Sequence, residues 1–139
     1  MSDPILSAQV LDTGIRDRLN QLQRKTGNLE IPMRNIGQAL LLSTDTRWQQ
    51  EIDPQGKSWK PNSPYTIAQK RAQGRINKIL QNTGRLRDSI TAQASRDRVV
   101  IGTNVAYADK NQKERQFLGL SKDDEQEIIA ILDEFLAEE

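Results

Sequence analysis

The last segment of the chain, Ser121 to Glu139, carries eight acidic residues and one lysine. Carboxylates at this density could bind a metal ion or act as an acid/base pair. However, Asp123, Asp124 and Glu125 directly follow Ser121, where a helix is expected to begin. Acids favour the positive end of a helix dipole, and Asp124 stands three residues after Ser121, as in a capping box. Helix capping therefore explains these carboxylates without any chemistry.

Other catalytic groups are scarce, because the sequence has no Cys and no His. The usual zinc sites, the Cys or Ser–His nucleophile systems and the commonest general base are thereby removed. The stretch Thr83-Gly84-Arg85 has one glycine and no suitable preceding strand, so it does not form a phosphate loop. A hydrolase or nuclease would have to use Asp and Glu alone. We therefore expect no enzyme, no cofactor and no metal.

The middle of the chain is basic, with eight Lys or Arg and no acid between residues 57 and 87. Such runs usually face water. The segment could instead meet the acidic end, within one subunit or across a head-to-tail interface, where complementary potentials fix orientation. A third interpretation is contact with DNA phosphates, which needs the side chains on one surface. The residues are Lys57, Lys60, Lys70, Arg71, Arg75, Lys78, Arg85 and Arg87.

The chain of 139 residues is the size of one domain. Hydrophobic residues make up 35% and aromatic residues 4%, which predicts a thin core that neighbouring subunits could complete. There is no run of eighteen apolar residues, and the first nine residues do not resemble a signal peptide. We expect a soluble protein, cytoplasmic when made, with no membrane contact.

Apolar residues at helical spacing predict two N-terminal helices, the first ended by Gly27 and the second capped by Asn28 and ending near Ile52. The stripes are Leu11, Ile15, Leu19 and Leu22, then Met33, Ile36, Leu40, Thr44 and Trp48. An antiparallel pair is the first expectation, although a Gly-ended break also permits a sharp bend. Residues 1–53 are thus predicted to form a helical hairpin, in one structural domain with an α+β core at 54–139.

Residues 53–64 read as a connecting loop that opens with a turn at Asp53-Pro54-Gln55-Gly56. Trp59 lies within this polar loop, and such an aromatic more often pins a loop to the core than binds a ligand. Ser63 as cap and Pro64 as first helical residue then predict a short helix ending near Gly74.

From residue 90 to 95, apolar and polar residues alternate, as in a strand with one buried face. A turn at Arg96-Asp97 and the β-branched run from Val99 to Ile101 follow, which predicts a β-hairpin over residues 90–102. The uninterrupted second run indicates a central strand covered on both faces, and further strands from this chain or a neighbour are required. The last helix should follow Ser121. The expected fold is α+β, with a small antiparallel sheet and the C-terminal helix packed on it.

An ordered set of motifs from about residue 47 to 135 is similar to the phage virion morphogenesis family, which includes the Mu-type G protein and the tail completion protein S. In family members, a longer segment with a His-Gln-x-Gly-like stretch usually separates a Tyr-Ala pair from the next motif. In this chain only residues 109–114 lie between Tyr107-Ala108 and the motif that begins at Arg115. The motifs are Pro54-x-Gly56-x-x-Trp59, Thr66, Lys70, Ile79-Leu80-Gln81-x-Thr83-Gly84-x-Leu86-x-x-Ser89-Ile90, Val100-Ile101-Gly102-Thr103, Tyr107-Ala108 and Arg115-Gln116-Phe117-Leu118-Gly119-Leu120-Ser121.

The resemblance implies a structural subunit of a tailed bacteriophage, acting in tail completion or as a tail terminator or neck ring at the head–tail connector. It also implies that six copies of the chain form a ring. The partners of this ring would be tail tube, tail or neck proteins. The protein would belong to the virion, and to the host cytoplasm during assembly. DNA in the central channel is a further potential partner.

Candidate contacts follow from the same considerations. The basic residues named above are candidates for an acidic partner surface or a DNA channel, and a DNA-binding module using residues 57–87 is the alternative function. Apolar or aromatic residues in or beside loops are candidates for subunit contacts, although the core is the favoured place for each of them. They are Trp59, Tyr65, Leu86, Phe117 and Leu118.

Overall fold

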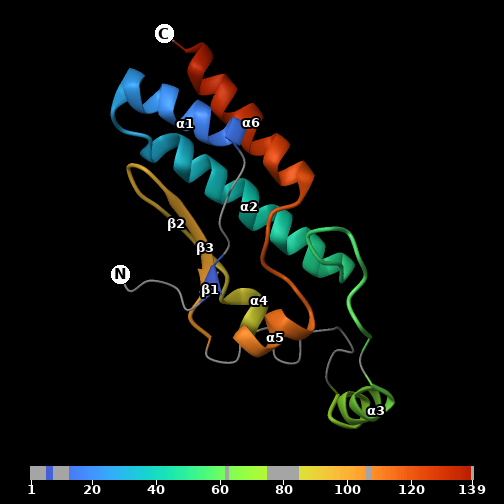
Figure 1. The fold of residues 1–139 in the computed structure, drawn as a ribbon. Helices are drawn as coiled ribbons and strands as arrows, with labels where there is room; N and C mark the ends of the chain where they lie inside the picture. Colours follow the sequence, from blue (N-terminus) through green and yellow to red (C-terminus); the bar gives the residue numbers. More distant parts are fainter. Residues whose placement is uncertain (1–5, 8–12, 62, 75–84, 106–107, 139) are drawn as a thin grey trace.

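The structure is a computed structural model that describes residues 6–7, 13–61, 63–74, 85–105 and 108–138. Figure 1 shows α2 between a small sheet and the pair formed by α1 and α6. The predicted α+β class is confirmed. The elements are β1 (Leu6–Ser7), α1 (Thr13–Thr26), α2 (Glu30–Gln50), α3 (Pro64–Ala72), α4 (Arg85–Asp88), β2 (Thr91–Ala94), β3 (Val99–Thr103), α5 (Ala108–Glu114) and α6 (Lys122–Ala137).

Both predicted apolar stripes form helices. All five stripe residues of α2 are buried, and α1 buries Ile15 and Leu22, while Leu11 lies outside the described residues. Gly27 ends α1 with a φ of +73°, which glycine adopts without strain. Two details of α2 were wrong. It ends at Gln50, two residues before Ile52, and its N-cap is Leu29, whose side chain makes no capping hydrogen bond. The Asn28 side chain, one residue earlier, accepts a hydrogen bond from the backbone N–H of Glu30 at 3.0 Å.

The predicted hairpin is confirmed, with β2 and β3 antiparallel from Thr91–Gly102 to Ala94–Val99. β3 is the central strand, as predicted, and the third strand comes from this chain, where β1 pairs antiparallel with β3. α2 packs on one face of the sheet. Side chains alternate along a strand, and Val100, on the opposite face, is only half-buried. The prediction of cover on both faces was therefore wrong at this position.

The predicted packing of the C-terminal helix on the sheet was wrong. α6 packs along α1 and α2, and α2 separates it from the sheet because α2 itself covers the sheet face. It runs parallel to α1, since Arg18 pairs with Asp133 at 2.7 Å and Lys25 donates to the carbonyl of Leu136 at 3.0 Å. Its buried stripe, Ile128 and Leu132, is at most 1% exposed. Across the described ranges, no helix is long and apolar enough to cross a membrane.

Gly37 lets α2 approach the sheet closely. A Cβ at this position would lie 3.1 Å from both the Ala92 Cβ and the Val99 Cγ2. We expect Gly37→Leu to lower the free energy of unfolding by about 1–3 kcal/mol through overpacking, measured by urea denaturation. The exposed neighbour Gln38 supplies the control Gln38→Leu, and equal losses in the two variants would contradict this account.

Candidate functional site

The carboxylate of Asp124 is the centre of a buried polar network. Ser121 accepts a hydrogen bond from the Asp124 N–H at 2.9 Å, and the Asp124 carboxylate accepts one from the Ser121 N–H at 3.0 Å. The predicted capping box is thus confirmed. The same carboxylate accepts hydrogen bonds from Ser43 and, at 2.8 Å, from Arg47 on α2. It therefore joins the start of α6 to the C-terminal half of α2.

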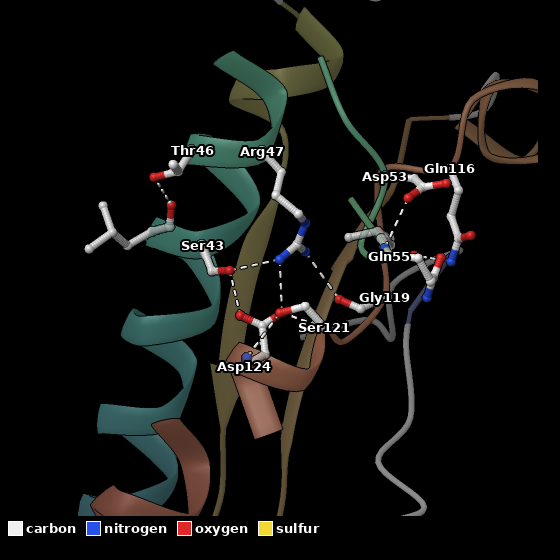
Figure 2. A network of polar contacts seen from close by, with 11 residues as sticks. Ser43, Thr46, Arg47, Asp53, Gln55, Gln116, Gly119, Ser121 and Asp124 are labelled. Carbon is white, nitrogen blue, oxygen red and sulfur yellow. Dashed lines mark hydrogen bonds and ion pairs between the residues drawn. The ribbon is translucent and has the colours of Figure 1, made fainter. Parts of the chain in front are cut away.

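Arg47 is the cation of this network, and Figure 2 shows its guanidinium pointing at Ser43, Asp124 and the carbonyl of Gly119. The side chains of Arg47 and Asp124 are only 8% and 5% exposed. Arg47 also donates to the Ser43 hydroxyl at 2.7 Å and to the Gly119 carbonyl at 3.1 Å. A buried ion pair stabilises little in net terms, but removing one partner is costly because the other charge stays buried.

An aromatic cluster lies at the C-terminal end of α2. The rings of Trp48 and Trp59 meet edge to face with centroids 5.5 Å apart, and Phe117 lies 4.9 Å from Trp48. The indole N–H of Trp59 donates to the carbonyl of Gln116 at 2.7 Å, which satisfies its one polar group. Trp59 is 6% exposed and so pins the 53–60 loop to the core, as the sequence predicted.

The 53–57 turn has the predicted form. The Asp53 carboxylate accepts hydrogen bonds from the backbone N–H groups of Gln55 and Lys57, both at 2.9 Å, and Gly56 has a φ of +86°. Pro54 then approaches Gly119 so closely that a Cβ on Gly119 would lie 2.8 Å from the proline ring. This contact holds the turn against the residues that precede α6.

Residues 115–121, one of the motifs noted in the sequence, connect these features. Arg115 donates to the backbone carbonyls of Lys60 and Pro61 at 2.6 and 3.2 Å, and Gln112 accepts from the N–H groups of Phe117 and Leu118, both at 3.0 Å. Together with the contacts of Gln116, Gly119 and Ser121 described above, this makes the motif a junction between α2, the 53–61 loop and α6. Its roles in the described structure are those of positioning, not of reaction.

An open groove of about 1060 Å³ lies between the C-terminal half of α2, the 53–56 turn and the first turns of α6. Its apolar lining includes Leu40, Ile52, Pro54 and Leu120, together with Leu42, which is 70% exposed. Acidic residues from α6 also line it, namely Asp123, Asp124, Glu125 and Glu127. Among the described residues, no three His, Cys, Asp or Glu side chains are placed so that together they could hold a metal ion. The groove is thus suited to binding a basic, partly apolar surface.

The structure separates the apolar candidate contacts into two kinds. Trp59, Leu86, Phe117 and Leu118 are at most 6% exposed and belong to the subunit core. Tyr65, on α3, is 74% exposed. Contact of any of them with another subunit stays a prediction, and Tyr65 is the one whose side chain is available for it.

The basic candidates differ in exposure and pairing within the described part of the chain. Lys57, Lys60 and Arg71 are exposed, whereas Lys70 is only 7% exposed. Arg87 on α4 pairs with Asp45 on α2 at 2.7 Å. Arg75, Lys78 and the side chain of Arg85 lie outside the described residues.

Sequence reasoning missed the importance of Arg47, Ser43 and Gln112. Arg47 stands next to the stripe residue Trp48 and one turn after Ser43, so its position on the buried side was the available signal. A charge at such a position is expected to be paired.

Residues 10–112 match the model of the phage virion morphogenesis family. The match includes the N-terminal helices, which precede the motifs noted in the sequence, and it ends before the 115–121 motif. Neither the curated proteins nor the solved structures gave a match.

The buried network predicts unequal effects for two neighbouring acids. Asp124→Asn leaves the charge of Arg47 buried without its partner, and we expect a loss of about 3–5 kcal/mol in the free energy of unfolding. Ser121→Ala, which removes only the cap, should cost about 1 kcal/mol. Asp123→Asn, at an exposed position, is the matched control for urea denaturation. A loss at Asp124 no larger than that at Asp123 would show that the pair is not important for stability.

The Asp45–Arg87 pair predicts a small, pH-dependent effect. The hydrogen bond from Arg87 holds the pKa of Asp45 below its ordinary value of 3.8, and the bond to Asp45 raises the pKa of Arg87. A depressed carboxylate pKa stabilises the fold above the unfolded-state pKa, and this contribution is lost as pH falls through the folded-state pKa. Asp45 is 56% exposed and Arg87 is 22% exposed, so solvent screens the pair, and Arg87→Gln should cost about 0.2–1 kcal/mol at neutral pH.

This difference between Arg87→Gln and the wild type should shrink as the pH falls below the ordinary aspartate pKa of 3.8. It should disappear only when the pH lies below the lowered pKa of Asp45 in the folded wild type, where this carboxyl is protonated in both proteins. Urea denaturation at a series of pH values measures it. A difference that grows towards acid pH would contradict the predicted sign.

Proposed function

The chain belongs to the phage virion morphogenesis family, and we propose that it is a structural subunit at the head-proximal tail end or the head–tail connector. The family match covers residues 10–112, which supports a role in phage assembly and association with the virion. The same membership indicates a structural rather than a catalytic protein. Tail completion, termination or neck formation is the finer role that we propose.

The observation that carries the proposal is that buried polar residues stabilise the subunit, whereas exposed charged residues of opposite sign lie at different places on its surface. Buried polar side chains, above all Arg47 and Asp124, hold elements of the subunit together. Exposed basic residues lie on the 57–60 loop and α3, while exposed acids line the groove at the start of α6. Unlike surfaces at different places on one subunit suit a cyclic ring, in which every interface is heterologous.

We propose that the partners are further copies of this chain, arranged as a ring of six by family resemblance, and neighbouring tail tube, tail or neck proteins. The subunit would assemble in the host cytoplasm and remain in the virion. The DNA-binding alternative gains no support, since Lys70 is buried and Arg87 is paired to an acid.

The proposal predicts a defect in particle assembly. Phage that lack this chain should accumulate heads and tails that are unjoined or tails of abnormal length, visible by negative-stain electron microscopy. Supplying the wild-type chain in trans is expected to restore joined particles, which is the control for indirect effects. Normal yields of joined particles with tails of normal length, in the absence of the chain, would refute the proposed role.

A further inference from the structure

We infer that α3 and its flanking residues, 63–74, form an arm that docks in the α2–α6 groove of a second copy of this chain. The inference rests on the proposed role as a self-associating subunit and specifies the contact through which copies would join. It starts from an exposed helix face, an open groove and the relative position of the two.

The arm presents an apolar face to solvent. Tyr65, Ala68 and Ala72 are exposed and spaced by three and four residues, so they share one side of α3. The opposite side, with Ile67 and Lys70, is half-buried to buried. Apolar side chains at this spacing are the usual anchors of a helix that binds in a groove.

The base of the arm is fixed by contacts with the rest of the subunit. Ser63 caps α3 by accepting a hydrogen bond from the N–H of Thr66 at 3.1 Å. Immediately before it, Arg115 holds the carbonyls of Lys60 and Pro61. Figure 1 shows α3 standing away from the main body, at the lower right of the view, and no residue of α3 lines the groove. The arm therefore does not occupy its own groove, and a second copy is the occupant that can supply one.

The groove complements the arm in charge and in apolar surface. Asp123, Glu125 and Glu127 line its α6 side, and Leu42 exposes 70% of its surface. The arm and the loop before it offer the exposed cations Lys60 and Arg71, and the chain has no acid between residues 57 and 87. Tyr65 would contact Leu42, and the cations would face the carboxylates, which fixes one direction of docking.

The dimensions are also compatible. α3 has nine residues and is about 14 Å long at the rise of an α-helix. The groove volume of about 1060 Å³ is sufficient for the exposed side of such a short helix. The arm of each copy binds the groove of the next, so the contact is heterologous and can continue around a ring.

Two variants of the full-length chain test the contact. Tyr65→Ala/Arg71→Glu alters the arm and leaves the groove intact, whereas Leu42→Lys/Glu127→Lys alters the groove and leaves the arm intact. All four side chains are exposed or line the open groove, so both variants should fold, which circular dichroism checks. Analytical ultracentrifugation of each variant alone should show self-association weakened by about tenfold or more.

An equimolar mixture of the two variants should form a dimer and nothing larger, because only one intact arm and one intact groove remain per pair. Wild-type association should be concentration-dependent and weaker at high salt. The matched control Ile31→Lys/Glu134→Lys changes an exposed apolar residue of α2 and an exposed acid of α6, both outside the groove, and should associate like the wild type.

Three outcomes would overturn the contact: variants that associate as strongly as the wild type, a control that loses as much association as the groove variant, or a wild-type chain that stays monomeric. Loss of duplex DNA binding in the arm variant, with self-association unchanged, would also overturn it and assign the arm to DNA.

Complementation separates this inference from the proposed function. If phage lacking the chain still form joined particles, the proposed function fails. If those particles fail to form but both the arm and the groove variants restore them fully, the arm contact alone is wrong. Restoration by the control variant but by neither interface variant is the result expected.

Discussion

The arrangement of this subunit depends on one buried carboxylate. Asp124 caps α6, pairs with Arg47 and accepts a hydrogen bond from Ser43, so it satisfies a helix end and a buried cation together. Because Arg47 also binds the carbonyl of Gly119, the same cation fixes the residues that precede α6. The position of the acidic first turn of α6 relative to α2, and hence the shape of the groove between them, follows from these contacts.

Local signals in the sequence predicted most elements correctly. Ser121 with Asp124, Ser63 with Pro64, and the apolar stripe of α2 each act within a few residues, and each formed the expected structure. The partner of Asp124 could not be predicted, because Arg47 lies 77 positions away. The position of Arg47 on the buried side of α2 indicated that its charge needs a partner, but not which acid supplies it. α5 was missed for a related reason, since residues 108–114 have no apolar stripe of their own.

The low aromatic content is compensated by where the aromatic residues lie. Both tryptophans and Phe117 meet at one point, where α2, the 53–60 loop and the residues before α6 come together. The candidate site was only partly predictable, because this cluster joins residues that lie far apart in the sequence. The sequence indicated that Trp59 would be buried, but not that its burial would place the base of α3 beside Arg115.

The two-residue strand β1 has a consequence for the order of folding. Leu6 and Ser7 pair with Thr103 and Gly102, so this edge strand pairs with residues far later in the sequence. Contacts this distant in sequence form slowly and cannot form until most of the polypeptide has been synthesised. The α2–β2–β3 unit can collapse earlier from residues closer together. β1 would then join a sheet that already exists, and on the ribosome the sheet would lack this edge strand until β3 has been synthesised.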